Sequence, residues 1–198
     1  MASAIVVPAR VSARTLKRKL AGDVDSPAES TVQYVVTKCS LGTLLVAGTE
    51  RGVCCVLLGE SVREVIEDLQ GRFACAVRGA SDSRVAKWAA QIASLADKPS
   101  AAKLKASAVP LDVRGTAFQR RVWRALGEIS CGETRTYAEV AAAIGRPLTV
   151  RAVANACGAN PTGIVVPCHR VVRSDGGLGG YYWGVERKAK LLAAEGAR

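Results

Sequence analysis

The stretch TYAEVAAAIGRPLTVRAVANACGAN, residues 136–160, contains two helix patterns separated by a short turn. Thr136 and Glu139 have the spacing of a capping box, which predicts a helix over Tyr137–Ile144. A proline and a later glycine predict the start and the end of a second helix over 147–158. Two short helices around a glycine-containing turn are typical of a helix-turn-helix, although an ordinary helical hairpin has the same pattern.

The charge of the chain favours the helix-turn-helix. Twenty-eight lysine and arginine residues face 17 aspartate and glutamate residues, which gives a formal net charge of +11. Such a balance is typical of proteins that bind a polyanion, and Arg146 and Arg151 lie near the start of the second predicted helix. We therefore predict that this helix pair binds DNA, while a merely basic protein remains the alternative.

The first half of the chain has a different pattern. The runs TVQYVVTKC, TLLVAGT and VCCVLL are short, rich in β-branched residues and separated by turn signals, which predicts a small antiparallel sheet. Ser61 and Glu64 form a capping box for a helix that continues to Phe73, and a second helix fits Ser83–Ala96. The predicted fold class is therefore α+β.

Three parts follow from these patterns. Residues 1–30 are basic and then polar, which predicts a disordered tail, although an organelle-targeting peptide or a nuclear signal around KRK would look similar. Residues 31–110 form an N-terminal α/β subdomain that ends in a linker over 96–110. Residues 111–198 form a helical subdomain whose last helix we expect over Val185–Glu195.

Cysteine and histidine limit the possible chemistry. The chain has seven cysteines and one histidine, and several cysteines lie inside apolar runs, which is typical of a reducing compartment. A zinc site needs more ligands than one close cysteine pair and one histidine offer, so we expect no metal and no cofactor. No apolar run reaches the length of a membrane span, so we expect no contact with a membrane.

The histidine follows a cysteine in GIVVPCHRVVRSDG, residues 163–176. Cys168 is a candidate nucleophile and His169 the candidate base, and because adjacent side chains diverge, a bridging water would connect them. Glu195, at the end of the last helix, is the candidate carboxylate that orients the imidazole. The alternative is a buried thiol beside a core histidine.

PCHRVV, preceded by GANPTGIV and followed by GYYWGVERKAKLLAAEG, resembles the O6-alkylguanine-DNA alkyltransferases. YVVTKCSLGTLLVAGTERGVCCVLLGE and PLDVRGTAFQRRVWRALGEISCGETRTYAEVAAAIGRP resemble the same family, so the resemblance covers about residues 32–196. It implies a ribonuclease H-like N-terminal subdomain, followed by a helical subdomain that contains the helix-turn-helix.

The resemblance also implies a function. Such proteins take an alkylated base out of double-stranded DNA and transfer the alkyl group of O6-alkylguanine, or of O4-alkylthymine, irreversibly to their own cysteine. We expect a monomer without an obligate protein partner, cytoplasmic in a prokaryote or nuclear in a eukaryote. The implied catalytic residues are Cys168 as acceptor, His169 as water-linked base, Glu195 as its orienting carboxylate, Tyr137 as donor to the leaving guanine, and Asn160 as the residue that holds the turn.

The implied DNA contacts are Arg151, which fills the place of the extruded base, together with Arg146, Thr149 and Tyr137. The implied substrate pocket consists of Cys157, Gly163, Val171, Tyr181 and Tyr182. Two of these depart from the family pattern, because some relatives have a proline in place of Gly163 and a small hydroxyl residue in place of Tyr182. We therefore expect less surface for a bulky alkyl group.

Three other functions have to be weighed. A protein that only marks alkylated bases would lack the reactive cysteine, whereas Cys168 stands in an intact motif. A helix-turn-helix regulator without chemistry would not need the cysteine, histidine and glutamate together. A cysteine hydrolase would need an oxyanion hole or a nucleophile elbow, and no such pattern surrounds the thiol.

Overall fold

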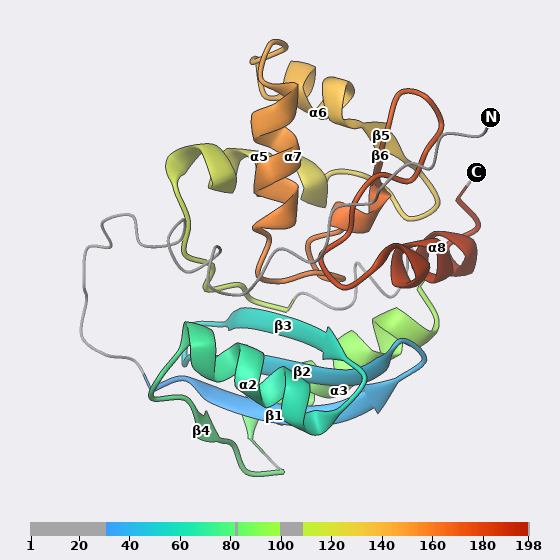
Figure 1. Cartoon of the computed structure of the whole chain (residues 1–198). Coiled ribbons are helices and arrows are strands. Elements are labelled where there is room, and N and C mark those ends of the chain that lie inside the picture. Colours follow the sequence, from blue (N-terminus) through green and yellow to red (C-terminus); the bar gives the residue numbers. More distant parts are fainter. Residues whose placement is uncertain (1–30, 82, 100–108, 198) are drawn as a thin grey trace, which may run out of the picture.

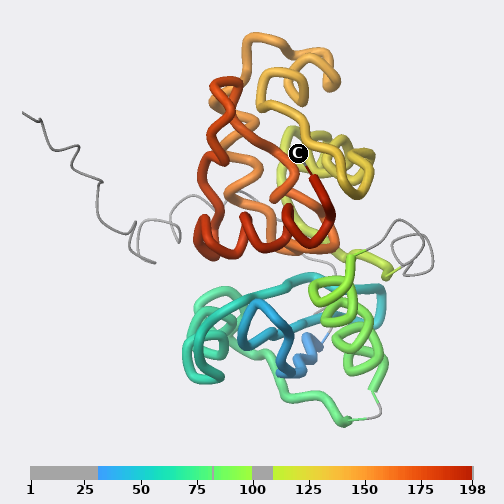
Figure 2. The backbone as a smooth tube through the Cα atoms, turned by 90° about the vertical axis from the view of Figure 1, so that its right-hand side faces the viewer, coloured from blue at the N-terminus to red at the C-terminus, as the bar shows by residue number. Residues whose placement is uncertain are grey.

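The structure is a computed structural model that describes residues 31–81, 83–99 and 109–197, so the predicted tail over 1–30 lies outside the described residues. The predicted linker, 96–110, is described only at its two ends. A sheet with one helix on each face forms one part of the molecule, and a group of helices lies on one side of it (Figure 1). The view at right angles shows the same two parts stacked on each other (Figure 2).

The predicted antiparallel sheet is present. Strands β1 (Gln33–Cys39), β2 (Gly42–Gly48) and β3 (Val53–Gly59) pair in antiparallel fashion, with β2 in the middle. A short strand that the sequence did not predict, β4 (Val77–Arg78), pairs in parallel with β1. Two residues are too few for an alternating pattern, so this strand gave no signal.

Helices cover both faces of the sheet. Helix α2 (Val62–Arg72) is capped by Ser61, and α3 (Arg84–Asp97) is capped by Ser83. Side chains alternate along β2, so Leu44 and Val46 pack into the cluster with α3, while Leu45 and Ala47 pack into the cluster with α2. A central strand buried on both faces explains why its sequence is almost wholly apolar.

The helical part begins with α5 (Ala117–Gly127) and α6 (Tyr137–Ala143). Both have complete capping boxes, at Thr116 and at the predicted Thr136, where the threonine side chain and a side chain three residues later cap each other's backbone N–H groups. The prediction of α7 (Val150–Gly158) was wrong at its start, because Pro147 lies in a turn ahead of the helix. In that turn the N–H and the hydroxyl of Thr149 both donate to the carbonyl of Arg146, so the helix begins only at the next residue, Val150.

The chain then returns to the start of α6. The turn η1 (Cys168–Arg170) leads into β6 (Val171–Val172), which pairs in parallel with β5 (Arg135–Thr136) immediately before α6. Helix α8 (Val185–Ala194) follows, with Glu195 as its C-cap residue. The pairing of β5 with β6 therefore holds the PCHR turn beside the helix-turn-helix.

The edge of β3 joins the two parts of the molecule. The N–H of Val53 donates to the carbonyl of Pro110 over 2.8 Å, and the N–H of Val56 donates to the carbonyl of Pro161 over 2.7 Å. These bonds satisfy backbone groups that an edge strand would otherwise leave open. Because Pro161 lies only a few residues before Cys168, the sheet also fixes the segment that leads to the cysteine.

Candidate active site

Cys168 lies at the first position of the η1 turn and is 6% exposed. The side-chain amide of Asn160 donates to the carbonyl of Val166 over 2.8 Å and to the Cys168 sulfur over 3.2 Å. The carbonyl oxygen of the same amide accepts from the N–H of Thr162 over 3.0 Å and from its hydroxyl. Asn160 therefore holds both sides of the loop before the cysteine and contacts the sulfur itself.

His169 and Arg170, the next two residues of the turn, both contact Glu195. The Nε2 atom of His169 lies 3.0 Å from Oε1 of Glu195, and Arg170 donates from Nε and Nη2 to the two carboxylate oxygens over 2.8 Å each. A third donor of Arg170 binds the carbonyl of Ile129 over 2.6 Å. The three side chains are at most 3% exposed, so this is a buried ion pair with its hydrogen bonds satisfied.

The partners determine which nitrogen of His169 carries the proton. A carboxylate only accepts hydrogen bonds, so Nε2 is the donor to Glu195. Burial lowers the pKa of His169 despite the opposing effect of Glu195, which keeps the ring neutral near pH 7. Its other nitrogen, Nδ1, is buried without a hydrogen-bond partner among the described residues and is free to accept a proton.

The two acidic groups of the site are shifted in opposite directions. Burial would raise the pKa of Glu195, but the hydrogen bonds from His169 and Arg170 and their charges outweigh it and lower the pKa to about 2. Burial raises the pKa of the Cys168 thiol to about 11, although the Asn160 hydrogen bond and the charge of Lys188 oppose the shift. At pH 7 the carboxylate is charged and the thiol is neutral, so the thiol needs a base to react.

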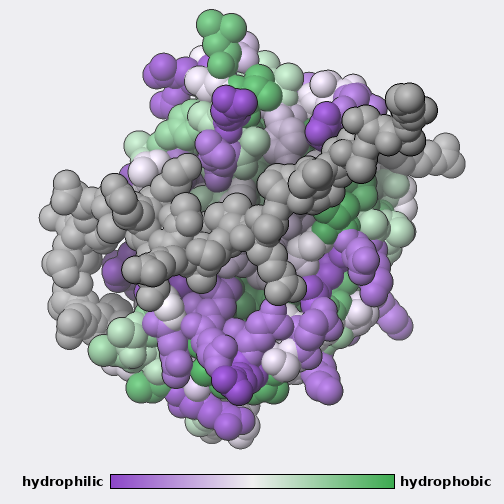
Figure 3. Space-filling view, viewed as in Figure 1, coloured by the Kyte–Doolittle hydropathy of each residue, from purple (hydrophilic) through white to green (hydrophobic). Residues whose placement is uncertain are grey.

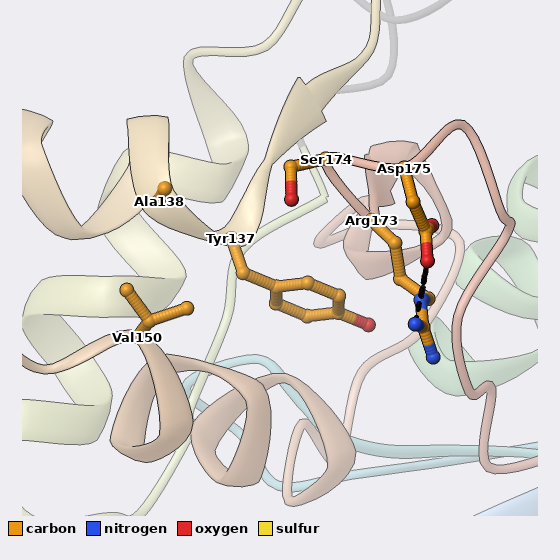
Figure 4. A pocket seen from close by; sticks show the side chains of 6 residues that line it. All are labelled: Tyr137, Ala138, Val150, Arg173, Ser174 and Asp175. Carbon is orange, nitrogen blue, oxygen red and sulfur yellow. Dashed lines mark hydrogen bonds and ion pairs between the residues drawn. The ribbon is translucent and has the colours of Figure 1, made fainter.

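Tyr137, the first residue of α6, lies half-buried at a pocket of about 200 Å³ beside the helix-turn-helix. Its ring points between α7 and the loop after β6, toward the ion pair of Arg173 and Asp175 (Figure 4). Burial raises the pKa of the phenol, so the hydroxyl keeps its proton and can donate. Gly179 makes room for it, since a Cβ at that position would lie 3.0 Å from the hydroxyl oxygen.

The predicted DNA contacts lie on the outside of the helix-turn-helix. Arg146 is exposed in the turn, Arg151 is exposed in the first turn of α7, and Thr149 is half-buried between them. The tip also carries apolar side chains that the sequence analysis did not assign: Leu148 is 98% exposed and Val150 is 39% exposed. An apolar patch at the tip of the helix-turn-helix, with hydrophilic side chains around it, is visible in the space-filling view (Figure 3).

The predicted pocket residues fall into two groups. Cys157 and Val171 are buried in the same apolar cluster as Cys168, and Tyr181 contacts the ring of His169 edge to face at 6.5 Å. Tyr182 is 43% exposed, and its hydroxyl and ring contact Asp68 and Arg72 of α2. Its assignment to the pocket stays a prediction, and its contacts lie on the side of the sheet.

Gly163 has a neighbour that the sequence analysis overlooked. A Cβ at this glycine would lie 2.2 Å from the ring of Trp183, so the tryptophan occupies the space that a larger side chain would need. Trp183 is 6% exposed and also contacts Tyr181 edge to face. The side chain that fills the space beside Gly163 is thus Trp183.

The chain is similar to known proteins over most of its length. A family model described as "6-O-methylguanine DNA methyltransferase, DNA binding domain" matches residues 117–197. The inducible methylated-DNA–protein-cysteine methyltransferase of Bacillus subtilis is 38% identical over 153 residues, which cover 76% of this chain and 82% of that protein. The chain belongs to the methylated-DNA–protein-cysteine methyltransferase family.

Two further relatives describe the extent of the match. The bifunctional transcriptional activator/DNA repair enzyme Ada of Escherichia coli is 49% identical over 165 residues, which cover 83% of this chain and 45% of that protein. The chain therefore spans about half the length of this relative. The crystal structure of Mycobacterium tuberculosis OGT in complex with DNA has a TM-score of 0.68 and 35% identity, and the match covers 83% of this chain and 92% of that one.

Lys188 is a further residue of this methyltransferase family member that the sequence did not single out. Its side chain is fully buried, and Nζ donates to the carbonyls of Val171 and Leu178. Burial lowers the pKa of its ammonium group, while its charge lowers the pKa of Cys168. The charged run VERKAK predicts only an exposed helix face, so the sequence held no signal for a buried lysine.

No helix in the described ranges is long and apolar enough to cross a membrane. Within the same ranges, no group of three or more histidine, cysteine, aspartate or glutamate side chains is arranged to hold a metal ion.

Glu195→Gln should lower the free energy of unfolding by about 3–5 kcal/mol, because it leaves Arg170 buried without its counter-charge. The pKa of Glu195 is lowered from 4.5 to about 2 in the folded chain, so its stabilisation is present above pH 4.5 and is lost as the pH falls toward 2. The variant should lack that part of the pH dependence, which denaturant unfolding at a series of pH values measures.

The control is Glu186→Gln, which removes an exposed glutamate from the first turn of α8. It should change stability by no more than about 0.5 kcal/mol, as surface substitutions usually do. Equal pH profiles for wild type and Glu195→Gln would refute the strong coupling of this carboxylate.

Gly163→Ala should lower the free energy of unfolding by about 1–3 kcal/mol, the usual cost of inserting a methyl group into a packed core. The new Cβ must displace the buried ring of Trp183. Gly127→Ala is the matched control, because a Cβ there meets nothing within 4 Å. A Gly163→Ala protein as stable as wild type would show that the ring yields freely. If the ring does not yield, Gly163→Ala should cost less in a Trp183→Leu background than in wild type.

Proposed function

We propose that this chain repairs DNA by direct damage reversal, transferring the alkyl group of O6-alkylguanine in double-stranded DNA to its own Cys168. The observation that carries the proposal is the set of contacts around the PCHR turn. A buried thiol accepts a bond from Asn160, and a neutral histidine with one free nitrogen follows it in the chain, oriented by Glu195. Membership of the methyltransferase family supports the same chemistry.

The first step is removal of the thiol proton. Nδ1 of His169 is the free lone pair, and a bridging water carries the proton to it from Sγ of Cys168. The imidazolium that forms keeps its Nε2 bond to Glu195, which stabilises the new positive charge. The thiolate is stabilised by the Asn160 amide and by the charge of Lys188.

The second step is displacement at the alkyl carbon. The Cys168 sulfur forms a bond to this carbon while the bond from carbon to O6 breaks, and the electron pair of that bond stays on guanine. The Tyr137 hydroxyl donates to a ring nitrogen of the guanine and neutralises the developing anion. Overall the thiol loses one proton and the guanine gains one: Tyr137 gives its proton to the guanine and recovers one from water, while the imidazolium of His169 releases its proton to water. The guanine returns unmodified to the duplex.

The product explains why no cofactor is needed and why the reaction occurs once. A carbon–sulfur thioether has no leaving group that water could displace, in contrast to the thioester of a cysteine hydrolase. The same chemistry would accept O4-alkylthymine.

The chain acts as a monomer without an obligate protein partner, in the cytoplasm of a prokaryote or the nucleus of a eukaryote.

DNA binding is assigned to the helix-turn-helix. Arg151 lies exposed at the start of α7 and fills the stack that the extruded nucleotide leaves, while Arg146 and Thr149 contact the backbone nearby. The apolar tip at Leu148 is available for contact with sugars and bases. The positive charge of the chain supports binding to phosphates, which should weaken as salt rises.

Incubation with a duplex that contains O6-methylguanine should add one methyl group per chain, on Cys168, with no second turnover. Intact-protein mass spectrometry followed by peptide mapping measures both. Cys168→Ala should abolish transfer while DNA binding persists, because the buried thiol offers little contact area. Cys75→Ala, which removes an exposed cysteine of the sheet part, is the control and should leave transfer intact.

Two results would refute the proposed function. One is repair of several lesions by one protein molecule, and the other is methyl found on a cysteine other than Cys168.

Arg151→Ala should slow repair in duplex DNA by at least about tenfold, because extruding a nucleotide without a replacement costs a few kcal/mol. Its reaction with the free base O6-methylguanine should change little, since nothing has to be extruded. Arg78→Ala removes an exposed arginine from β4 and should affect neither reaction. Equal losses in both reactions for Arg151→Ala would indicate a structural role instead.

A further inference from the structure

Helix α2 ends in an arginine that reaches the loop between β6 and α8. The guanidinium of Arg72 lies 5.2 Å from the centre of the Tyr182 ring, and the same group donates to Asp68 over 3.0 Å and 3.3 Å. The hydroxyl of Tyr182 also donates to Asp68, over 3.4 Å. One side chain of the loop is thus held by a cation and a carboxylate that both belong to the sheet part of the molecule.

From Tyr182 a continuous row of aromatic contacts leads to the candidate base. Tyr182 meets Trp183 edge to face at 5.3 Å, and Trp183 meets Tyr181 at 5.2 Å. Tyr181 in turn meets the ring of His169 at 6.5 Å. Such edge-to-face pairs have preferred geometries, so a shift of one ring disturbs the next.

Hydrogen bonds hold the backbone of this loop at Leu178, at Trp183 and between Gly184 and Tyr181, whereas the side chain of Tyr182 needs contacts of its own. Gly179 and Gly184, on either side of the aromatic residues, have φ angles of +71° and +98°, which few other residues adopt. Trp183 is buried with the core of the sheet part, and Tyr181 packs against the cores of both parts. Tyr182 belongs to neither core, so its position depends on the contacts with α2.

The row also reaches the residues around the acceptor cysteine. Trp183 packs against Gly163, and Tyr181 packs in the cluster that contains Cys168. If Tyr182 moved outward, Trp183 would lose the ring that backs it, and the space beside Gly163 would widen. The outer contact with α2 therefore bears on how large an alkyl group the site accepts.

We propose that Arg72 and Asp68 are positioning residues of the sheet part that, through Tyr182, hold the Trp183–Tyr181 wall against the acceptor and restrict the site to small alkyl groups. The proposal rests on the alkyl transfer proposed above. Neither residue touches the alkylated base. Their influence passes through three aromatic rings.

A second ion pair on the same helix shows what an ordinary surface pair looks like. Arg63 and Glu67 have the same spacing and lie 2.7 Å apart, but their side chains are 87% and 60% exposed. Arg72 and Asp68 are 18% and 33% exposed, and an aromatic ring covers the guanidinium. Exposed ion pairs of this spacing contribute little to stability, so the Arg63–Glu67 pair is a matched control for the Arg72–Asp68 pair.

The experiment compares the rates at which Cys168 takes up benzyl and methyl groups from O6-benzylguanine and O6-methylguanine in the same duplex. Arg72→Met keeps the length of the side chain and removes its charge, and it should raise the ratio of the benzyl rate to the methyl rate about threefold to fivefold, the size expected for loss of a partly exposed cation–π contact. Tyr182→Leu should do the same. Tyr182→Phe keeps the ring and should have a smaller effect.

A double-mutant cycle separates positioning from a general loss of stability. If Arg72 acts through Tyr182, the Arg72→Met/Tyr182→Leu double variant should change the ratio no more than either single variant does. Arg63→Met should leave the ratio unchanged. Thermal unfolding of each variant shows whether it is folded. If Arg72→Met does not fold, Tyr182→Leu still tests the contact between the loop and α2.

A second probe makes the proposal independent of DNA repair. Methyl methanethiosulfonate and benzyl methanethiosulfonate each transfer their alkylthio group to a cysteine: a disulfide bond forms, the bond between sulfur and the sulfonyl group breaks, and methanesulfinate leaves. Peptide mapping isolates the rates at Cys168. Arg72→Met should raise the benzyl-to-methyl ratio here as well, even if the wild-type chain transfers nothing from DNA, an outcome that would overturn the proposed function alone. A wild-type ratio in Arg72→Met with these reagents, or additive effects in the double variant, would overturn the positioning role.

Discussion

The carboxylate of Glu195 accepts hydrogen bonds from two neighbouring residues of one turn, in a place that water barely reaches. A buried carboxylate is stable only when its charge is compensated and its oxygens are satisfied, and Arg170 and His169 do both. Through Arg170 the cluster also reaches the carbonyl of Ile129, in the segment that follows α5. The end of α8, the PCHR turn and the end of α5 are therefore fixed by one interaction.

The same cluster explains how a thiol with a raised pKa can act at neutral pH. Before the reaction the buried centre holds one carboxylate, two cations, a neutral imidazole and a neutral thiol. Moving the proton from Cys168 to His169 creates two charges, and each finds an opposite charge already in place. The imidazolium lies beside the Glu195 carboxylate, and the thiolate is stabilised by the charge of Lys188. Separating the charges therefore costs less free energy than the individual pKa values imply.

Local signals were the part of the fold that the sequence predicted well. The capping box at Thr136 lies within the first turn of the helix it opens, so its geometry follows from the local sequence. The start of α7 was wrong because a proline is compatible with both a helix start and a turn, and the choice depends on the hydrogen bonds of Thr149 to Arg146. Contacts between distant residues gave no local signal, as with Tyr182 and Asp68, which are 114 positions apart.

The candidate site shows the same division. Cys168 and His169 could be singled out because they are adjacent and the histidine has no counterpart elsewhere in the chain, whereas Lys188 resembles the exposed lysines of any amphipathic helix. Its burial depends on the carbonyls of Val171 and Leu178, which exist in that position only after the chain has folded. Sequence reasoning therefore finds the candidate nucleophile, and only the structure finds the buried positive charge near it.

The division of the molecule into two parts also has a chemical consequence. The side chains proposed to react all lie in the helical part, yet the edge of β3 binds the backbone at Pro161, and Trp183 beside Gly163 is buried in the core of the sheet part. Backbone hydrogen bonds and buried rings support the turn that carries the thiol. Exposed ion pairs would contribute little to its stability. The sheet part is thus a structural component of the site, because it holds the segment before the thiol and the ring beside it.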